Sequence, residues 1–226
     1  MTERELAALF DHTYLKANGT QKDFDRIIQE AIEIQPATVA VNQTPLIYFV
    51  NKLTPYGIKV DTGAGFPLGA NTIETKVFEA LNAIENGAGE IDYMVNVSRV
   101  LDHDWNFIDE EMQRMVEAVH GKGILLKVIF ENCYLDHYEI VKLCRLAVKN
   151  KVEFIKTSTG MVTGGGATVG DVRLMKDTVG NDCKVKASGG IRTWETCKAM
   201  LDAGAERIGT SSSLRILEEF REAYKG

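Results

Sequence analysis

Three lysines stand inside segments that otherwise have the composition of buried β-strands. Lys127 interrupts the apolar segment 125–130, Lys156 follows Phe154 and Ile155, and Lys186 follows a valine. Lysine is almost never fully buried without a partner. The alternative for each is a side chain that extends along the outer surface and keeps its ammonium group in water. A single such lysine would favour that alternative, whereas three of them favour a site at which they meet.

An aspartate shares this pattern. Asp92 lies in the strand-like segment 90–97, and the two-residue period of a strand places Asp92, Met94 and Asn96 on one face. If that face and the lysines point to the same enclosed side of a sheet, a carboxylate lies beside the ammonium groups. A charged cluster of this kind is typical of an active site.

Lys156 and Lys186 each begin the same five-residue pattern, K-x-S-x-G. The pattern reads KTSTG from residue 156 and KASGG from residue 186, so the two copies are 30 residues apart. That spacing corresponds to about one strand–helix unit. The two lysines are therefore expected at equivalent positions of neighbouring strands, each followed by a turn of small residues.

Two neighbouring lysines can produce a nucleophile. An isolated lysine is almost entirely protonated at pH 7. A second ammonium group about 7 Å away costs about 2.4 kcal/mol at an effective dielectric constant of about 20, and so lowers the pKa of the first. Burial acts in the same direction. A neutral lysine amine attacks carbonyl groups and forms a Schiff base, with Asp92 and the second lysine moving protons.

Two turns in the last third of the chain predict a phosphate site. SGGIRT follows the strand-like segment 184–187, and GTSSS begins at residue 209 and opens the final helix. Glycines let backbone N–H groups approach an anion, and a helix N-terminus favours negative charge. Ordinary turn and N-cap chemistry would explain either turn alone. Both turns beside the lysines favour phosphate.

Strand-like segments alternate with helical ones along the chain. The expected strands are residues 11–13, 38–41, 58–62, 90–97, 125–130, 154–157, 184–187 and 207–209. Strands that are each followed by a helix pair in parallel through right-handed crossovers. An open doubly wound sheet and a closed barrel both satisfy this rule. Eight strands in 226 residues favour an α/β fold of the (β/α)₈ TIM-barrel type, as a single domain over residues 1–226.

Several other chemistries are disfavoured. In the glycine-rich segment 63–69 the third glycine comes one residue late for a dinucleotide site, and Pro67 stands where the helix should begin. The four histidines lack the spacing of a metal site. The sequence therefore predicts neither a metal nor another cofactor.

Composition limits the partners and the compartment. With 26 basic and 32 acidic residues the net charge is −6, which disfavours nucleic acid and anionic membranes. No apolar run approaches the roughly 18 residues of a membrane span, and the N-terminus lacks the plan of a signal peptide. The four cysteines could form two disulfides, but reduced thiols in a cytoplasm are favoured. The oligomeric state is left open, a homodimer included.

Taken in order, these motifs resemble the deoxyribose-phosphate aldolase family of class I aldolases. The resemblance rests on residues 11–13 (DHT), 15–16 (LK), 65–69 (GFPLG), 90–92 (EID), 126–129 (LKVI), 156–160 (KTSTG), 165–169 (GGATV), 186–193 (KASGGIRT) and 207–211 (RIGTS). It implies a cytoplasmic (β/α)₈ barrel without a metal. It also implies reversible cleavage of 2-deoxy-D-ribose 5-phosphate to D-glyceraldehyde 3-phosphate and acetaldehyde.

The resemblance also assigns roles. Lys156 is implied as the Schiff-base lysine, Lys186 as the lysine that perturbs it and assists proton transfer, and Asp92 as part of the proton relay, with Lys127 close by. The residues expected at the phosphate are Gly160, Gly189, Gly190, Ser211 and Ser212.

Four positions depart from the pattern usual in the family, and two rival functions stay open. Ala40 stands where a cysteine is common, Ala17 where a proline is usual, Asn132 where a threonine is usual, and Met161 where an aromatic residue or lysine is common. None of these changes removes a catalytic group. One rival is a phosphate-binding barrel lyase or isomerase that uses acid–base chemistry without a covalent lysine, and the other is a non-catalytic sugar-phosphate sensor.

Overall fold

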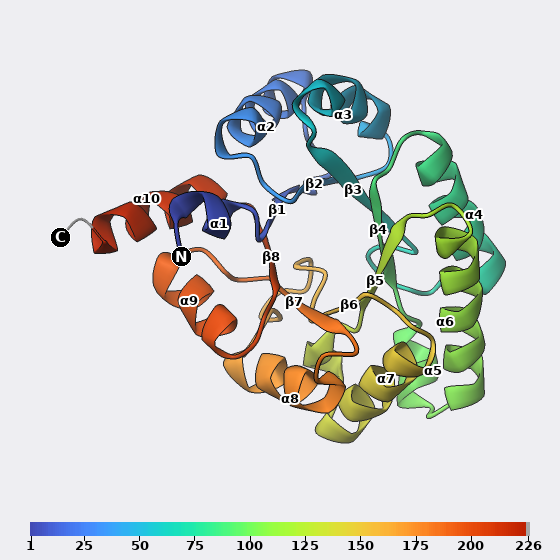
Figure 1. Cartoon of the computed structure of the whole chain (residues 1–226). Coiled ribbons are helices and arrows are strands. Elements are labelled where there is room, and N and C mark those ends of the chain that lie inside the picture. The colour runs from blue at the N-terminus through green and yellow to red at the C-terminus, as the bar shows by residue number, and fades with distance from the viewer. Residues whose placement is uncertain (225–226) are drawn as a thin grey trace.

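Eight parallel strands close into a barrel in the computed structural model, which describes residues 1–224 (Figure 1). Each strand pairs with the next along the chain, and the last pairs with the first. The strands are β1 (Phe10–Tyr14), β2 (Thr38–Val41), β3 (Lys59–Ala64), β4 (Glu90–Met94), β5 (Leu125–Ile129), β6 (Phe154–Lys156), β7 (Lys184–Ser188) and β8 (Arg207–Thr210). The predicted (β/α)₈ barrel and all eight of its strands are confirmed.

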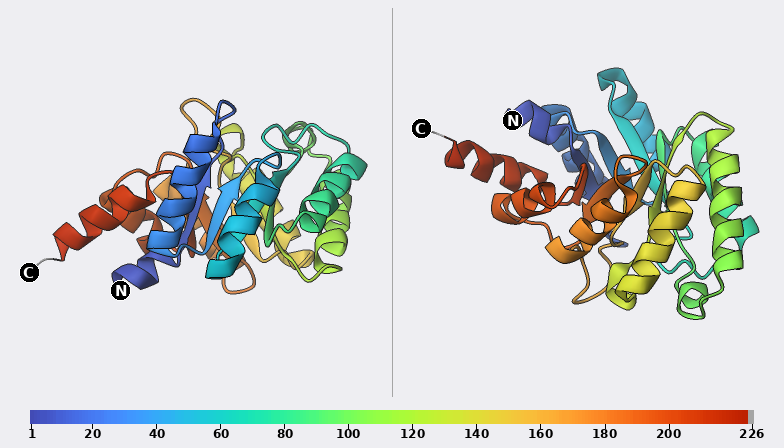
Figure 2. Two further views of the ribbon diagram at one scale, coloured as in Figure 1. Left: turned by 90° about the horizontal axis from the view of Figure 1, so that it is seen from above. Right: turned by 60° about the horizontal axis from the view of Figure 1, so that its bottom comes forward.

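Helices form a wall outside the strands, as the side views in Figure 2 show. They are α1 (Glu3–Ala7), α2 (Gln21–Ile34), α3 (Leu46–Leu53), α4 (Ile73–Glu85), α5 (Val97–Leu101), α6 (Trp105–His120), α7 (His137–Lys149), α8 (Val169–Val179), α9 (Trp194–Asp202) and α10 (Ser213–Ala223), with 3₁₀ turns at Thr54–Tyr56 and Asn132–Tyr134. None of the helices in the described part of the chain is long and apolar enough to cross a membrane.

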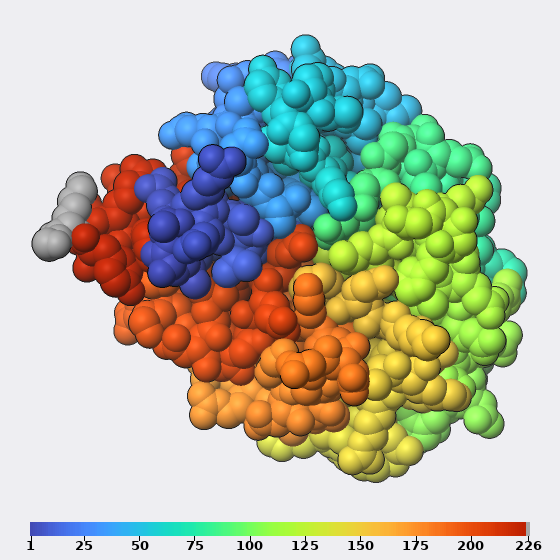
Figure 3. All heavy atoms as spheres, in the orientation of Figure 1, coloured from blue at the N-terminus to red at the C-terminus, as the bar shows by residue number. Residues whose placement is uncertain are grey.

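The two ends of the described chain meet on one side of the barrel. Helices α1 and α10 contact each other, as the dark blue and red surfaces in Figure 3 show. The ring of Trp194, the first residue of α9, packs edge-on against Phe220 of α10, with ring centroids 4.9 Å apart. The last helix, α10, thus packs against both α1 and α9.

Alternation along the strands separates an apolar outer face from a charged inner one. In β4, Ile91 and Tyr93 pack in the hydrophobic core, whereas Glu90 and Asp92 enter ion pairs with residues of other strands. The predicted inward position of Asp92 is confirmed. The prediction for Asn96 is wrong, because β4 ends at Met94 and the Asn96 side chain instead accepts a hydrogen bond from the Arg99 N–H as the N-cap of α5.

A buried ion pair joins two of the outer helices. Lys76 of α4 donates to Oε1 of Glu111 of α6 at 2.5 Å, and neither side chain is exposed. The second oxygen of Glu111 accepts the N–H of Asn96 at 3.1 Å. Burial lowers the pKa of Lys76 and raises that of Glu111, and each partner opposes the shift of the other. The pair therefore depends on both members being present.

This pair gives a test of the outer wall. Lys76→Met leaves a buried carboxylate without its partner, and Glu111→Gln leaves a buried ammonium group. Each change is expected to lower the free energy of unfolding in urea by about 3–5 kcal/mol. The double variant contains neither unpaired charge, so its loss should be smaller than the sum of the two. Additive losses would show that the two side chains do not act as a pair.

Candidate active site

Eight charged side chains from seven strands meet inside the barrel, and their formal charges cancel. All but Arg207, which is about one-eighth exposed, are almost fully buried. The carboxylates are Asp11, Asp61, Glu90 and Asp92, and the cations are Lys127, Lys156, Lys186 and Arg207. The lysines therefore do not extend along the outer surface, and we refer to this set of eight as the buried charge cluster.

Asp92 is the carboxylate that all three lysines share. Its Oδ2 atom accepts hydrogen bonds from Lys156 and Lys186, each at 2.7 Å, and its Oδ1 atom accepts one from Lys127 at 2.7 Å. Burial by itself would raise the pKa of Asp92. The three ammonium groups outweigh burial and hold that pKa well below its usual range. Asp92 is therefore an ionised carboxylate that fixes the positions of three amines.

Lys127 and Lys186 are each surrounded by several carboxylates. Lys127 Nζ lies 2.8 Å from Glu90, 3.1 Å from Asp61 and 2.7 Å from Asp92. Lys186 pairs with Asp11 and Asp92 and lies 3.3 Å from Asp61. Burial opposes charge on both lysines, but the carboxylates raise the pKa of each above its ordinary value. Both side chains therefore stay protonated.

Lys156 has a different environment from the other two lysines. Asp92 is its one ion-pair partner within residues 1–224. Burial lowers the pKa of Lys156, and the ammonium group of Lys186 adds to this effect, while Asp92 opposes it. The neighbouring ammonium therefore acts in the predicted direction, but burial is the larger cause. Of the three lysines in the cluster, Lys156 is the one that most readily provides a neutral amine.

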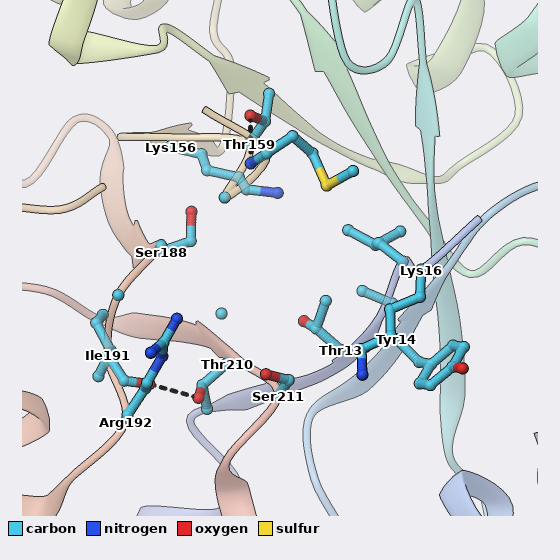
Figure 4. Close-up of a pocket in the computed structure, with 17 residues that line it drawn as sticks. Thr13, Tyr14, Lys16, Lys156, Thr159, Ser188, Ile191, Arg192, Thr210 and Ser211 are labelled. Carbon is cyan, nitrogen blue, oxygen red and sulfur yellow. Dashed lines mark hydrogen bonds between the residues drawn. The ribbon is translucent and has the colours of Figure 1, made fainter. Parts of the chain in front are cut away.

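A cavity of about 240 Å³ lies above Lys156 at the mouth of the barrel. In Figure 4, Lys156 reaches into it from one side, and Thr13 and Lys16 face it from the other. Neither Lys127 nor Lys186 is among the described residues that line the cavity. A carbonyl compound in this cavity thus has access to one of the three amines.

Four of the five residues expected at a phosphate line the same cavity. They are Gly160, Gly189, Gly190 and Ser211. Ser212 is not among the lining residues and instead occupies the N-cap position of α10, where its N–H donates to Thr210 Oγ1 at 2.9 Å. Arg192, which the sequence analysis did not single out, lines the cavity on this side. The rim therefore combines a cation, three glycines and Ser211, which directly precedes the N-cap of an eleven-residue helix.

Two glycines that line the cavity, Gly189 and Gly209, occupy positions that a side chain would not fit. Gly189 has φ +86°, and a Cβ atom there would lie 2.9 Å from the Gly166 Cα atom. At Gly209, β8 passes β7 so closely that a Cβ atom would lie 2.9 Å from Ser188 Cβ and 3.2 Å from Lys186 Cε. Small residues in these turns therefore bring backbone to the cavity and leave room for Lys186.

Glu131 anchors the turn that follows the Lys156 strand. Its backbone has φ +57°, a left-handed conformation that is uncommon for a residue other than glycine. The buried side chain accepts hydrogen bonds from both the N–H and the hydroxyl of Thr159. Thr159 and Gly160 line the cavity. Glu131 therefore fixes one wall of the cavity although it does not line it.

Sequence reasoning missed half of the buried charge cluster. Asp11, Asp61, Glu90 and Arg207 all stand within or next to predicted strands, as Asp92 does. The criterion that found Asp92, a charge inside a strand-like segment, would have found them too. Phe66, whose ring centroid lies 6.0 Å from Lys156 Nζ, carried no such signal.

The fold and this site together define a class of protein, the (β/α)₈ barrel enzymes, here with a buried lysine that reaches a cavity at the mouth of the barrel. Comparison with known proteins specifies the family. A family model described as "DeoC/LacD family aldolase" matches residues 6–218. The chain therefore belongs to the DeoC/LacD family of aldolases.

Individual relatives support this assignment over almost the whole chain. The chain is 49% identical to deoxyribose-phosphate aldolase 1 of Vibrio vulnificus over 92% of this chain and 93% of that protein. It is 45% identical to deoxyribose-phosphate aldolase of Thermoanaerobacter sp. over 96% and 97% of the two chains. The solved deoxyribose phosphate aldolase of Aeropyrum pernix superposes with a TM-score of 0.91 at 28% identity, over 98% of this chain and 93% of that one.

Two substitutions next to Lys156 should shift its pKa in opposite directions. Lys186→Met removes a nearby positive charge, so the Lys156 pKa should rise. Asp92→Asn removes the carboxylate that favours the ammonium form, so the pKa should fall. Competitive labelling with acetic anhydride across pH, read by peptide mass spectrometry with exposed Lys22 as internal reference, measures both. Shifts in the same direction, or none, would contradict this account.

Proposed function

We propose that the chain reversibly cleaves 2-deoxy-D-ribose 5-phosphate to D-glyceraldehyde 3-phosphate and acetaldehyde through a Schiff base on Lys156. The observation that carries this proposal is that Lys156 combines a lowered pKa with a position on the cavity, whereas Lys127 and Lys186 have neither. The names of the relatives support the same substrate.

The covalent steps follow from a neutral amine beside an aldehyde. The Lys156 amine adds to the C1 carbonyl of the open-chain sugar, and the resulting carbinolamine loses its hydroxyl as water to give an iminium ion. Loss of the C3 hydroxyl proton then breaks the C2–C3 bond, and the bonding pair moves into the iminium to form an enamine. D-Glyceraldehyde 3-phosphate leaves, C2 takes up a proton, and water releases acetaldehyde from the regenerated lysine.

Proton transfers in this scheme involve Asp92 and Lys186. The Asp92 Oδ2 atom lies 2.7 Å from both the Lys156 and the Lys186 Nζ atoms, so it links the reacting nitrogen to a second proton donor. Because the Asp92 pKa is held low, this carboxylate passes a proton on without retaining it. Lys127 contacts the other oxygen and supports the orientation of Asp92.

The rim of the cavity provides a place for the substrate phosphate. Gly160, Gly189, Gly190 and Ser211 line it, and Arg192 adds a positive charge there. Ser212 contributes from the N-cap of α10, where a helix N-terminus favours an anion. The phosphate binds at the rim while the aldehyde end of the sugar reaches Lys156 below.

Cytoplasmic location belongs to the same proposal. All four cysteines, three of them buried, are free thiols in the described chain. Free thiols accord with a reducing compartment. The disulfide alternative raised by the even cysteine count thus has no support among these residues.

Borohydride trapping tests the role of Lys156. Acetaldehyde and borohydride should attach a stable ethyl group to Lys156 of the wild type, mapped by peptide mass spectrometry. Lys156→Ala should abolish both the adduct and turnover, because among the described residues Lys156 alone both lines the cavity and pairs with Asp92. Lys186→Ala should lose activity as well, yet still be trapped on Lys156. A label on Lys186 or Lys127 would refute the assignment, and no label at all would favour a barrel enzyme or sensor without a covalent lysine.

A charge change at Ser211 tests the phosphate site. Ser211→Glu places a carboxylate at the rim, and repulsion of the phosphate should raise the KM for deoxyribose 5-phosphate about tenfold or more. Ser211→Gln is the control, since it has nearly the same size without the charge. Unphosphorylated deoxyribose should be affected similarly by both variants. If Ser211→Glu raises the KM for deoxyribose 5-phosphate and for unphosphorylated deoxyribose by the same factor, the phosphate binds elsewhere.

A further inference from the structure

Asp61 is a member of the buried charge cluster to which the proposed mechanism gives no role. It lies on β3 and is 1% exposed. Its Oδ2 atom is 3.1 Å from Lys127 Nζ and 3.3 Å from Lys186 Nζ. Its Oδ1 atom has no hydrogen-bond partner within residues 1–224. One oxygen of a fully enclosed carboxylate is thus left without stabilisation.

The neighbours of Asp61 from every strand around it are charged. Carboxylate oxygens of Asp11 (β1) and Asp92 (β4) lie within 4.8 Å of an oxygen of Asp61 and of each other. The other charged groups that face this region are Glu90 of β4, Lys127 of β5, Lys156 of β6, Lys186 of β7 and Arg207 of β8. Burial and the Asp92 charge raise the pKa of Asp61 to about 7, although Lys127 and Lys186 oppose the shift. Asp61 therefore changes its protonation state in the pH range in which an amine must be neutralised.

Charge balance links Asp61 to Lys156. With every group ionised, the cluster holds four positive and four negative charges. A neutral Lys156 amine would leave one uncompensated negative charge in a desolvated barrel, which is costly. Transfer of the Lys156 proton to a carboxylate of the same cluster keeps the total at zero. Asp11 and Asp92 are poor acceptors because nearby cations hold their pKa values below the usual range.

We propose that Asp61 stores the proton that Lys156 releases before it attacks the carbonyl, and returns that proton when the carbinolamine loses water. This inference rests on the proposed Schiff-base function. Asp61 does not line the cavity, so it exchanges protons with the reacting nitrogen through Lys186 and Asp92. It is therefore a positioning residue and not a catalytic one.

Hydrogen-bonded contacts provide the path. The Lys156 ammonium gives a proton to Asp92 Oδ2, Asp92 passes a proton to Lys186, and Lys186 gives one to Asp61 Oδ2, so that Lys186 and Asp92 end unchanged. The neutral amine then adds to the aldehyde. In the reverse direction the proton reaches the carbinolamine hydroxyl, the C–O bond breaks, water leaves, and the iminium carries the positive charge while Asp61 is again a carboxylate.

Two matched variants test this storage role. Asp61→Asn and Glu90→Gln each replace one carboxylate of the cluster by an amide, but Glu90 pairs with Lys127 and Arg207 and not with Lys186. The rate of acetaldehyde adduct formation on Lys156 is measured by borohydride quenching at pH 7 over a range of imidazole concentrations. Asp61→Asn should slow adduct formation about tenfold or more in dilute buffer, because loss of water from the carbinolamine then has no stored proton, and the rate should recover as added imidazolium supplies that proton in the cavity. Wild type and Glu90→Gln should not depend on imidazole.

The outcomes separate this inference from the proposed function. If the wild type forms its adduct on Lys156 but Asp61→Asn is as fast and as independent of imidazole, Lys156 exchanges its proton with solvent and the storage role is wrong. Equal imidazole dependence in both variants would show a general effect of cluster charge and would also overturn it. No Lys156 adduct in the wild type would refute the proposed function itself.

A measurement on the wild type avoids dependence on a variant that does not fold. Protein labelled with ¹³C at the aspartate carboxyl carbons is titrated by NMR between pH 5 and pH 9. One buried carboxyl resonance should titrate near pH 7 and shift again when acetaldehyde is trapped on Lys156. If every aspartate titrates below pH 5, Asp61 is ionised throughout and stores no proton.

Discussion

The three hydrogen bonds between Asp92 and the lysines are the interaction on which the site depends. Transferring charged side chains from water into a protein interior costs free energy, and this cost is offset only when ion-pair partners and hydrogen bonds are well placed. Asp92 meets that condition by accepting from Lys127, Lys156 and Lys186 at 2.7 Å each. Pairing of β4 with β5 places Asp92 beside Lys127, and pairing of β6 with β7 places Lys156 beside Lys186. Closure of the barrel through β8 and β1 then turns these side chains toward one enclosed interior.

Differences among the lysines then follow from how many carboxylates each one meets. Lys127 and Lys186 lie deep among Asp11, Asp61 and Asp92 and stay charged. Lys156 lies at the end of a three-residue strand, next to the cavity, and shares Asp92 with the other two. The same buried cluster therefore holds two lysines whose pKa is raised and one whose pKa is lowered.

Much of this arrangement is predictable from the sequence, because strand alternation is a local property. Lys127, Lys156, Lys186 and Asp92 are visible as charges in apolar segments, and the K-x-S-x-G repeat predicts that Lys156 and Lys186 are neighbours, which the register of β6 and β7 confirms. The strand predicted over residues 90–97 is too long, because β4 ends at Met94 and Asn96 caps helix α5. A polar residue after an apolar run can be either the last inward-facing residue of a strand or the N-cap of the following helix.

Other features depend on contacts between distant strands and could not be predicted from the sequence. Asp61 and Lys186 are 125 positions apart, and nothing in either segment states that their side chains meet. That Lys156 lines the cavity and Lys127 does not depends on the three-dimensional arrangement of the strands and loops. Likewise, GTSSS marks a helix N-terminus correctly, but the exclusion of Ser212 from the cavity lining depends on how α10 begins.

The two faces of the strands have separate functions. Stability comes from the outer face, where residues such as Ile91, Val128 and Ile155 pack without exposure against the helices. A buried ion-pair cluster contributes little by comparison, since well-packed apolar side chains of similar volume often stabilise a protein as much or more. Eight charges inside the barrel are therefore poorly explained by folding alone. They accord with the reaction proposed above, in which a proton leaves one amine and returns to it without a change in the total charge of the interior.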